Sequence, residues 1–214
     1  MKLPFTLEQF LDVFRQYNIA IWPMQVVLII LALIAFYFSI RNKTYSNKII
    51  VIILAFLWIW MSIMYHFLFF SSINKAAIAF GCLFMIQSLL FLYFGIIKNK
   101  INLRFNTDLY GVTGVILIVF ALLIYPIIGY WVGHVYPSSP TFGLPCPTTI
   151  FTFGILLLST TRIPMVIIII PFLWALIGFS AAFSLGIKED ISLLVSGLLS
   201  IVLIIYRNNK LSYG

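Results

Sequence analysis

Two histidines, two cysteines and one proline-rich loop are the parts of this sequence best suited to chemistry. Residues 133–149 read Gly-His-Val-Tyr-Pro-Ser-Ser-Pro-Thr-Phe-Gly-Leu-Pro-Cys-Pro-Thr-Thr and hold four of the nine prolines. This loop contains His134 and Cys146, whereas His66 and Cys82 lie within apolar runs. Imidazole and thiolate groups bind zinc and copper, and a thiolate is also a nucleophile. The loop is therefore the first place to look for a site.

Cys146 is flanked by two prolines and followed by Thr148 and Thr149. Proline suits the first position of a helix, so Pro147 predicts that Cys146 lies at or near the N-cap. There the helix dipole and the free amides favour the thiolate and lower the pKa of a cysteine. The two threonine hydroxyls are expected to bond within the first turn. The alternative is that Pro-Cys-Pro only shapes a turn, with Cys146 as a small apolar filler.

Several polar residues are expected to meet this loop at one end of the protein. The predicted ligand-binding residues are His66, Asn74, His134, Cys146, Thr148 and Thr149. Within this set, His66, His134 and Cys146 would make a zinc or copper site. Each histidine could instead bond a backbone carbonyl, although His66, between Tyr65 and Phe67, needs a partner inside the protein. A disulfide between Cys82 and Cys146 is a further alternative, and Glu189 and Asp190 are expected to cap helix ends.

The composition excludes a water-soluble domain. Hydrophobic residues make up 63% of the 214-residue chain and charged residues only 8%, against about 25% charged in ordinary soluble domains. The net charge of +8 comes from short basic clusters between apolar runs, which argues against nucleic acid as a partner. Such clusters are typical of membrane proteins, where they set the orientation and contact anionic lipids.

The apolar runs predict an all-α transmembrane bundle of seven helices. A spanning helix needs about 20 apolar residues, and the predicted spans are 19–40, 49–70, 76–97, 109–130, 150–160, 164–185 and 191–206. Residues 19–214 would thus form the transmembrane domain. Residues 1–18 precede it as a short amphipathic helix with Thr6 as N-cap, lying on the membrane surface or against the bundle. Gln87 and Ser88, deep in the third span, are expected to bond across helices.

The fifth predicted span is too short for a bilayer. Residues 147–161 would make a helix of about 22 Å, whereas the hydrocarbon core is about 30 Å thick. One explanation is that residues 143–149 dip below the outer surface, which is tolerated when the backbone is buried in protein. The other is local thinning of the bilayer, or an Arg162 side chain that reaches up to the interface.

The basic residues predict the orientation. Nine of the thirteen fall on one side of the predicted spans: Arg41, Lys43, Lys48, Lys98, Lys100, Arg104, Arg162, Arg207 and Lys210. The other side has only Lys2, Arg15, Lys75 and Lys188. By the positive-inside rule the N-terminus lies outside and the C-terminus inside.

Segments spread over nearly the whole chain resemble a bacterial integral-membrane family of unknown function. They are Pro4-Phe5-Thr6, Tyr17-Asn18 with Trp22-Pro23, Tyr65-His66, Ile73-Asn74, and above all residues 143–149, Gly-Leu-Pro-Cys-Pro-Thr-Thr. The resemblance implies a multi-pass protein of the bacterial inner membrane. It assigns no activity and no role to any residue.

Three functions fit these observations. The first is binding, sensing or transport of a small solute or metal ion through a polar, outward-facing pocket in the bilayer. The second is a membrane enzyme that uses Cys146 as a thiol or metal ligand, with a histidine as base. The third is a structural subunit that binds a protein partner. The sequence favours the first and assigns no catalytic residue.

Overall fold

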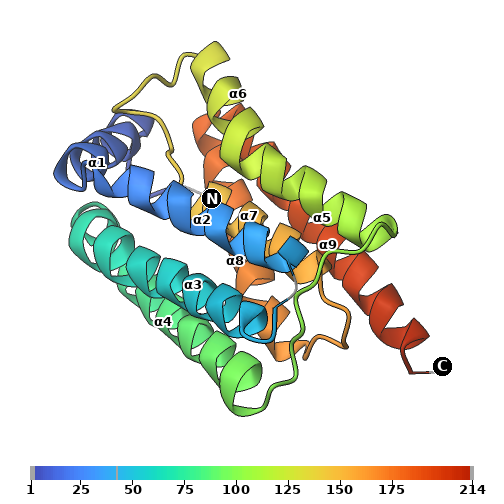
Figure 1. Cartoon of the computed structure of the whole chain (residues 1–214). Helices are drawn as coiled ribbons and strands as arrows, with labels where there is room; N and C mark the ends of the chain where they lie inside the picture. Colours follow the sequence, from blue (N-terminus) through green and yellow to red (C-terminus); the bar gives the residue numbers. More distant parts are fainter. Residues whose placement is uncertain (1–2, 42, 213–214) are drawn as a thin grey trace.

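The computed structural model describes residues 3–41 and 43–212, apart from the side chain of Lys188. Six helices are long and apolar enough to cross a membrane (Figure 1): α2 (Met24–Arg41), α3 with its π-helical and 3₁₀ continuation (Ser46–Ser72), α4 with a π-helical turn (Ala77–Ile97), the joined α5 and α6 (Leu109–Trp131), α8 (Val166–Leu185) and α9 (Ile191–Lys210). This confirms the prediction of an all-helical, multi-pass membrane protein. Lys2, counted above among the basic residues, lies outside the described residues.

The predicted fifth span is instead a short helix inside the bundle. Helix α7 (Pro145–Leu157) has 13 residues, and all of them are buried. It lies behind α2 in the middle of the bundle, and α5, α8 and α9 pack around it (Figure 1). A helix of this length covers only about 20 Å. Six of the seven predicted spans are therefore long helices among the described residues, and the remaining one, α7, is a core helix that has no lipid-facing side.

The loops at both ends of α7 are buried in the bundle where they join the helix. On one side, Gly143 packs against Leu28 of α2, and its carbonyl accepts a hydrogen bond of 3.1 Å from the Tyr17 hydroxyl. On the other, the Leu158 carbonyl accepts a hydrogen bond of 3.0 Å from the Arg104 amide. Backbone outside a helix is tolerated at this depth because protein groups satisfy it.

Gly143 shows why the loop before α7 needs a glycine. Its φ is +101°, in a region of backbone conformation that residues with a Cβ atom rarely adopt. A Cβ atom here would also lie 2.4 Å from Cδ1 of Leu28. Both the conformation and the close approach to α2 require glycine.

Helices α5 and α7 cross at a pair of glycines. A Cβ atom on Gly154 of α7 would lie 2.8 Å from the carbonyl oxygen of Gly114, and one on Gly114 would lie 2.7 Å from that of Gly154. Small residues allow such backbone contact in membrane bundles. This crossing fixes the position of α7 in the core.

Arg207 of α9 closes the other end of α7. Its guanidinium donates hydrogen bonds of 2.9 and 3.2 Å to the carbonyls of Leu157 and Leu156, the last residues of the helix. It also lies over the Tyr110 ring, 5.3 Å from its centroid. A cation here satisfies terminal carbonyls and complements the helix dipole. Arg207, one of the nine basic residues on the predicted cytoplasmic side, is thus buried.

Helix α1 (Leu7–Ala20) begins as predicted at Thr6. The Thr6 side chain accepts a hydrogen bond from the Gln9 amide, and Gln9 bonds back to the Thr6 amide, forming a capping box. The apolar face of α1 then packs on the π-helical end of α3, where Tyr17 meets Tyr65 edge to face at 5.9 Å. The helix is therefore held to the bundle by this face.

Polar residues within the spans bond across helices, as predicted for Gln87 and Ser88. The Gln87 amide donates to the Ile167 carbonyl of α8, and the Ser88 hydroxyl donates to the Ala55 carbonyl of α3. The Trp58 indole donates in the same way to the Thr152 hydroxyl of α7. These bonds join α3, α4, α7 and α8 into one unit.

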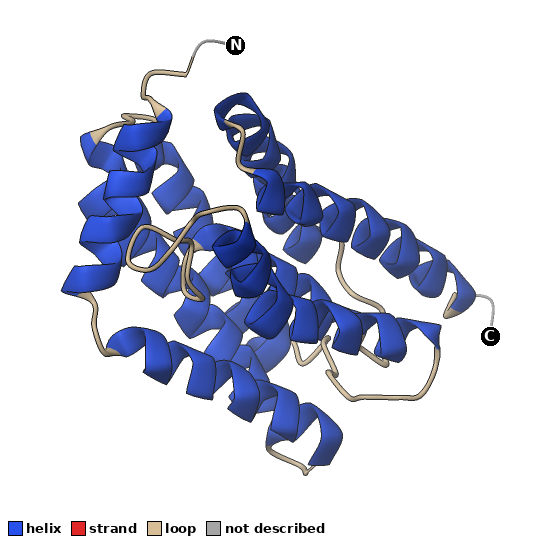
Figure 2. Ribbon diagram, turned by 90° about the horizontal axis from the view of Figure 1, so that it is seen from above, coloured by secondary structure: helices blue, strands red, loops and turns tan. Residues whose placement is uncertain are grey.

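The helices and their connecting loops divide the protein into two ends (Figure 2). One end contains α1, the turn after α3, the loop after α6 and the turn between α8 and α9. These segments contact one another, for example through Tyr17 with Gly143 and through His134 with Glu189. The other end contains the segments with the nine basic residues predicted to be cytoplasmic. Two of these segments meet where the Arg162 guanidinium donates a hydrogen bond to the Asn208 carbonyl. The site described next lies at the α1 end.

Candidate ligand cavity

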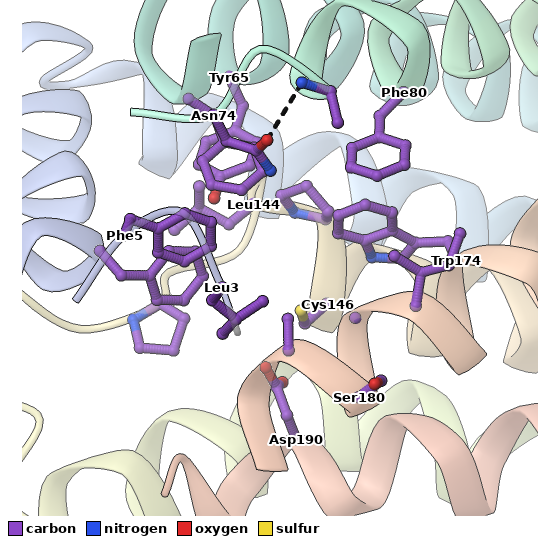
Figure 3. A pocket seen from close by; sticks show the side chains of 18 of the residues that line it. Leu3, Phe5, Tyr65, Asn74, Phe80, Leu144, Cys146, Trp174, Ser180 and Asp190 are labelled. Carbon is purple, nitrogen blue, oxygen red and sulfur yellow. Dashed lines mark hydrogen bonds between the residues drawn. The ribbon is translucent and has the colours of Figure 1, made fainter. Parts of the chain in front are cut away.

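A cavity of about 530 Å³ lies between the N-terminal segment, α4, α7 and α8. Most of its walls are apolar or aromatic, with Phe5, Phe70, Phe80 and Trp174 among them (Figure 3). Polar groups gather at a few places, where Cys146 and Asp190 lie close together on one side. The cavity is thus an apolar chamber with a small polar spot, rather than the polar pocket that the sequence predicted.

Asp190 is the acidic group of the cavity. It is 3% exposed, and its Oδ1 accepts a hydrogen bond of 2.5 Å from the Tyr125 hydroxyl. It precedes α9, but its side chain does not cap that helix, contrary to the prediction. Burial raises the pKa of Asp190 to about 6, although hydrogen bonds from Tyr125 and Cys146 act in the opposite direction. The group is therefore mostly charged at neutral pH.

Glu189 lies beside Asp190 and pairs with a predicted site residue. Its Oε1 is 2.5 Å from Nδ1 of His134, and its Oε2 is buried without a hydrogen-bond partner among the described residues. The Glu189 carboxyl is 0% exposed and the His134 side chain 14% exposed. The His134 ring thus contacts Glu189 and does not line the cavity.

Cys146 lines the cavity, but its chemistry is the opposite of that predicted. Helix α7 begins at Pro145 with Leu144 as N-cap, so Cys146 lies within the first turn. Burial, and then the charge of the neighbouring Asp190, raise the pKa of the thiol well above its ordinary value. The predicted low pKa is wrong because the thiol is buried and a carboxyl group faces the sulfur, and both effects oppose that of the helix dipole. No hydrogen bond among the described residues joins Cys146 to a histidine base.

Both cysteines are free thiols, Cys146 buried and Cys82 exposed. The alternative of a disulfide between them is therefore wrong. Cys82 lies on the outer surface of α4, whereas Cys146 faces the interior of the bundle. Two thiols that face different environments cannot form a bridge without backbone movement.

His66 lies behind the wall of the cavity rather than in it. It is fully buried on the π-helical segment Met61–Phe69, with its ring centroid 4.5 Å from that of Phe84 and 5.1 Å from that of Trp174. Neither ring nitrogen has a hydrogen-bond partner among the described residues. The expected polar partner is thus missing, since aromatic rings enclose the imidazole.

The other predicted residues have different roles. Asn74 lines the cavity, and its Oδ1 accepts a hydrogen bond from the Ala76 amide (Figure 3). The Thr148 hydroxyl accepts a hydrogen bond of 3.0 Å from the Gly143 amide and so joins the first turn of α7 to the loop before it, whereas a bond within the turn was expected. Thr149 is buried, and its hydroxyl has no partner among the described residues. Only Asn74 and Cys146 of the six predicted residues line the cavity.

The predicted metal site does not form. In the part of the chain that the structure describes, no group of three or more His, Cys, Asp and Glu residues could hold a metal ion. His66 is enclosed by aromatic rings, His134 pairs with Glu189, and Cys146 faces Asp190. The three predicted ligands therefore have separate environments.

Asn18 of α1 holds the proline-rich loop in place. Its amide donates hydrogen bonds of 2.6 and 2.8 Å to the carbonyls of Pro137 and Ser139, and its Oδ1 accepts one of 2.6 Å from the Thr141 hydroxyl. Asn18 is fully buried. The loop and α1 therefore form one layer next to the cavity, a contact that sequence spacing does not reveal.

Comparison with known proteins places the chain in a family without assigning an activity. No curated protein and no solved structure matches it. A family model described as "Family of unknown function (DUF6064)" matches residues 7–213, nearly the whole chain. The resemblance noted from the sequence to a membrane family of unknown function agrees with this match. The chain belongs to the DUF6064 family.

Proposed function

We propose that this protein binds a small molecule with a large apolar part in the cavity between the N-terminal segment, α4, α7 and α8. The cavity supports this most directly, because its volume of about 530 Å³ lies within the range of about 300–1,000 Å³ typical of ligand pockets. Its walls are mainly aromatic and aliphatic, as in most such pockets. Binding of this kind is the step that sensing and transport share.

The position of the cavity suggests how the ligand enters. Leu176 and Ile177 line it, and both lie on the spanning helix α8 with 40% and 38% of their surface exposed. The cavity therefore reaches the part of the protein surface that faces lipid. A ligand with a hydrocarbon body would enter from the lipid layer, where such molecules concentrate.

We further propose that the protein lies in the bacterial inner membrane with the cavity toward the outside. The nine basic residues at the end opposite α1 support this orientation by the positive-inside rule. Native binding would then occur in the outer leaflet.

The test is to fill the cavity. Ala181 lines the cavity on α8, so the larger side chain in Ala181→Phe should occupy part of it. This variant is expected to lose binding of a twelve-carbon alkyl probe such as dodecylamine or dodecanol. Native mass spectrometry would measure binding as a one-to-one adduct of protein and probe. Ala79→Phe is the matched control, because Ala79 is an exposed residue of α4 that does not line the cavity. Equal amounts of adduct in the two variants, together with equal melting temperatures, would refute the proposal.

A further inference from the structure

The charge balance around the cavity leaves one buried carboxyl without a cation. Glu189 and Asp190 are both buried, and among the described side chains only His134 forms an ion pair with either of them. That pair engages Glu189. Asp190 has hydrogen bonds from neutral groups, but no described Lys or Arg forms an ion pair with it. Buried charges are usually paired, so this carboxyl lacks a counter-ion among the described side chains, which do not include that of Lys188.

A second observation at the same place also indicates a ligand. Trp174 lines the cavity and is 7% exposed, and its indole N–H makes no hydrogen bond of ordinary geometry to the described residues. It does lie close enough to the Cys146 sulfur to lower the pKa of that thiol slightly against the stronger effect of burial. Figure 3 shows the indole nitrogen on the side of the ring toward Cys146 and Asp190. Buried polar groups in native proteins nearly always have a partner. The indole N–H, whose weak contact with the Cys146 sulfur leaves it able to donate to a ligand, and the Asp190 carboxyl therefore lie at the same polar spot.

The walls near this spot suit a cation with an apolar body. Trp174 packs edge to face on Phe80 at 5.6 Å, and Tyr65 stacks on Phe70 at 5.4 Å. All four rings line the cavity. Aromatic faces attract cations and also bury hydrocarbon, so one surface serves both parts of an amphipathic molecule.

We propose, on the basis of the function proposed above, that the ligand is an amphipathic amine whose charged nitrogen binds the Asp190 carboxylate and whose hydrocarbon body fills the aromatic chamber. The amine would supply the counter-ion that Asp190 lacks. A neutral alcohol could only accept a hydrogen bond from Trp174 or donate one to Asp190. A carboxylate ligand would be repelled by the carboxylates of Asp190 and Glu189.

This ligand class predicts how binding depends on pH. The titratable groups that face Asp190 are Tyr125, Cys146, Glu189, His134 and Tyr65, and none of them supplies a permanent positive charge. Asp190 gains its charge as the pH rises through about 6. A primary amine stays protonated over this range because its pKa is near that of lysine, about 10. Amine binding should therefore be stronger at about pH 7.5 than at about pH 5, and alcohol binding should not change.

The experiment compares dodecylamine, dodecanol and dodecanoate, which share one tail, by native mass spectrometry of the full chain. At about pH 7.5 we expect the amine to bind at least about tenfold more tightly than the alcohol, with the carboxylate weakest. Asp190→Asn should reduce the preference for the amine to about twofold or less. Asp12→Asn, at an exposed acid of α1, is the matched control and should leave the preference for the amine unchanged. Lys188→Gln, at the residue that precedes the two acids in the sequence, should also leave it unchanged, and tighter amine binding in this variant would mean that Lys188 already neutralises Asp190.

The outcomes separate this inference from the function on which it rests. If the alcohol binds as tightly as the amine, and Ala181→Phe removes both, the cavity binds ligands but the amine inference is wrong. If none of the three probes binds, the proposed function itself fails. The comparison of head groups and pH values in the unmodified protein needs no variant, so an unstable Asp190→Asn protein leaves the test intact.

Discussion

Gly154→Ala is expected to lower the melting temperature of the detergent-purified protein by roughly 6–12 °C. The added methyl group would lie 2.8 Å from the Gly114 carbonyl oxygen and 2.8 Å from a side-chain carbon of Ile118, so α5 and α7 must move apart. Overpacking of a tight core costs about 1–3 kcal/mol, and a contact with backbone should fall at the upper end. For a chain of this size each kcal/mol corresponds to about 2–4 °C.

Gly129→Ala is the matched control, since Gly129 is also a helical glycine of a membrane span. A methyl group there would meet its nearest neighbours, Glu189 Oε1 and the His134 carbonyl, at 3.8 and 3.9 Å, which is ordinary contact. Its melting temperature should stay the same or rise slightly, because alanine favours a helix over glycine by up to about 1 kcal/mol. Equal melting curves for both variants would contradict the close crossing of α5 and α7.

Arg207→Met is expected to destabilise the protein by about 3 kcal/mol, again roughly 6–12 °C by thermal unfolding. Methionine keeps much of the apolar stem but leaves the carbonyls of Leu156 and Leu157 without donors inside the bundle. Removal of one partner from a buried hydrogen bond exposes the full desolvation cost of the other. The melting temperature of Arg207→Lys should lie between those of the parent protein and Arg207→Met, because one ammonium group does not have the forked geometry of a guanidinium.

Arg41→Met provides the comparison at an exposed arginine. Arg41 lies at the end of α2, and its contacts are confined to the ring and hydroxyl of Tyr37 one turn earlier. Its replacement should change the free energy of unfolding by less than about 0.5 kcal/mol. If Arg207→Met had as small an effect, the guanidinium would not be stabilising the end of α7.

The spanning helices could be predicted because the bilayer imposes a length and a composition on each of them. Residues 191–206 lie in α9, and residues 24–40 of the predicted first span lie in α2, whereas Ile19 and Ala20 end α1. Thr6 caps α1 as expected. These features depend on local sequence alone. The same local rules place Gln87 and Ser88 at helix interfaces, since a polar side chain in a span needs a partner.

Helix α7 was predicted as a span because its residues are apolar, and apolar composition does not distinguish lipid from protein surroundings. The signals of a core helix are its length and its content of small and hydroxyl residues, Thr148, Thr149, Thr152 and Gly154. The burial of Arg207 was missed for a related reason. A positive charge near a helix end predicts a side of the membrane, but only tertiary structure shows that it reaches the carbonyls of another helix.

The candidate site was harder to predict because it depends on contacts between distant segments. Cys146 and Asn74 were identified, whereas Asp190, Trp174 and Tyr125 were not. Asp190 follows Glu189 in a turn between two spans, a pattern that usually indicates exposed caps. Burial of both acids is the observation that changes this interpretation, and it comes only from the fold.

The most direct test of the account is whether an amphipathic amine binds next to Trp174. Tryptophan fluorescence would be titrated with a brominated dodecylamine, whose bromine quenches nearby indoles, in the parent protein and in Trp174→Phe. We predict a saturable component of quenching in the parent that is absent from the variant, because Trp174 lines the cavity. Equal saturable quenching in both proteins would place the ligand elsewhere and contradict the assignment of this cavity.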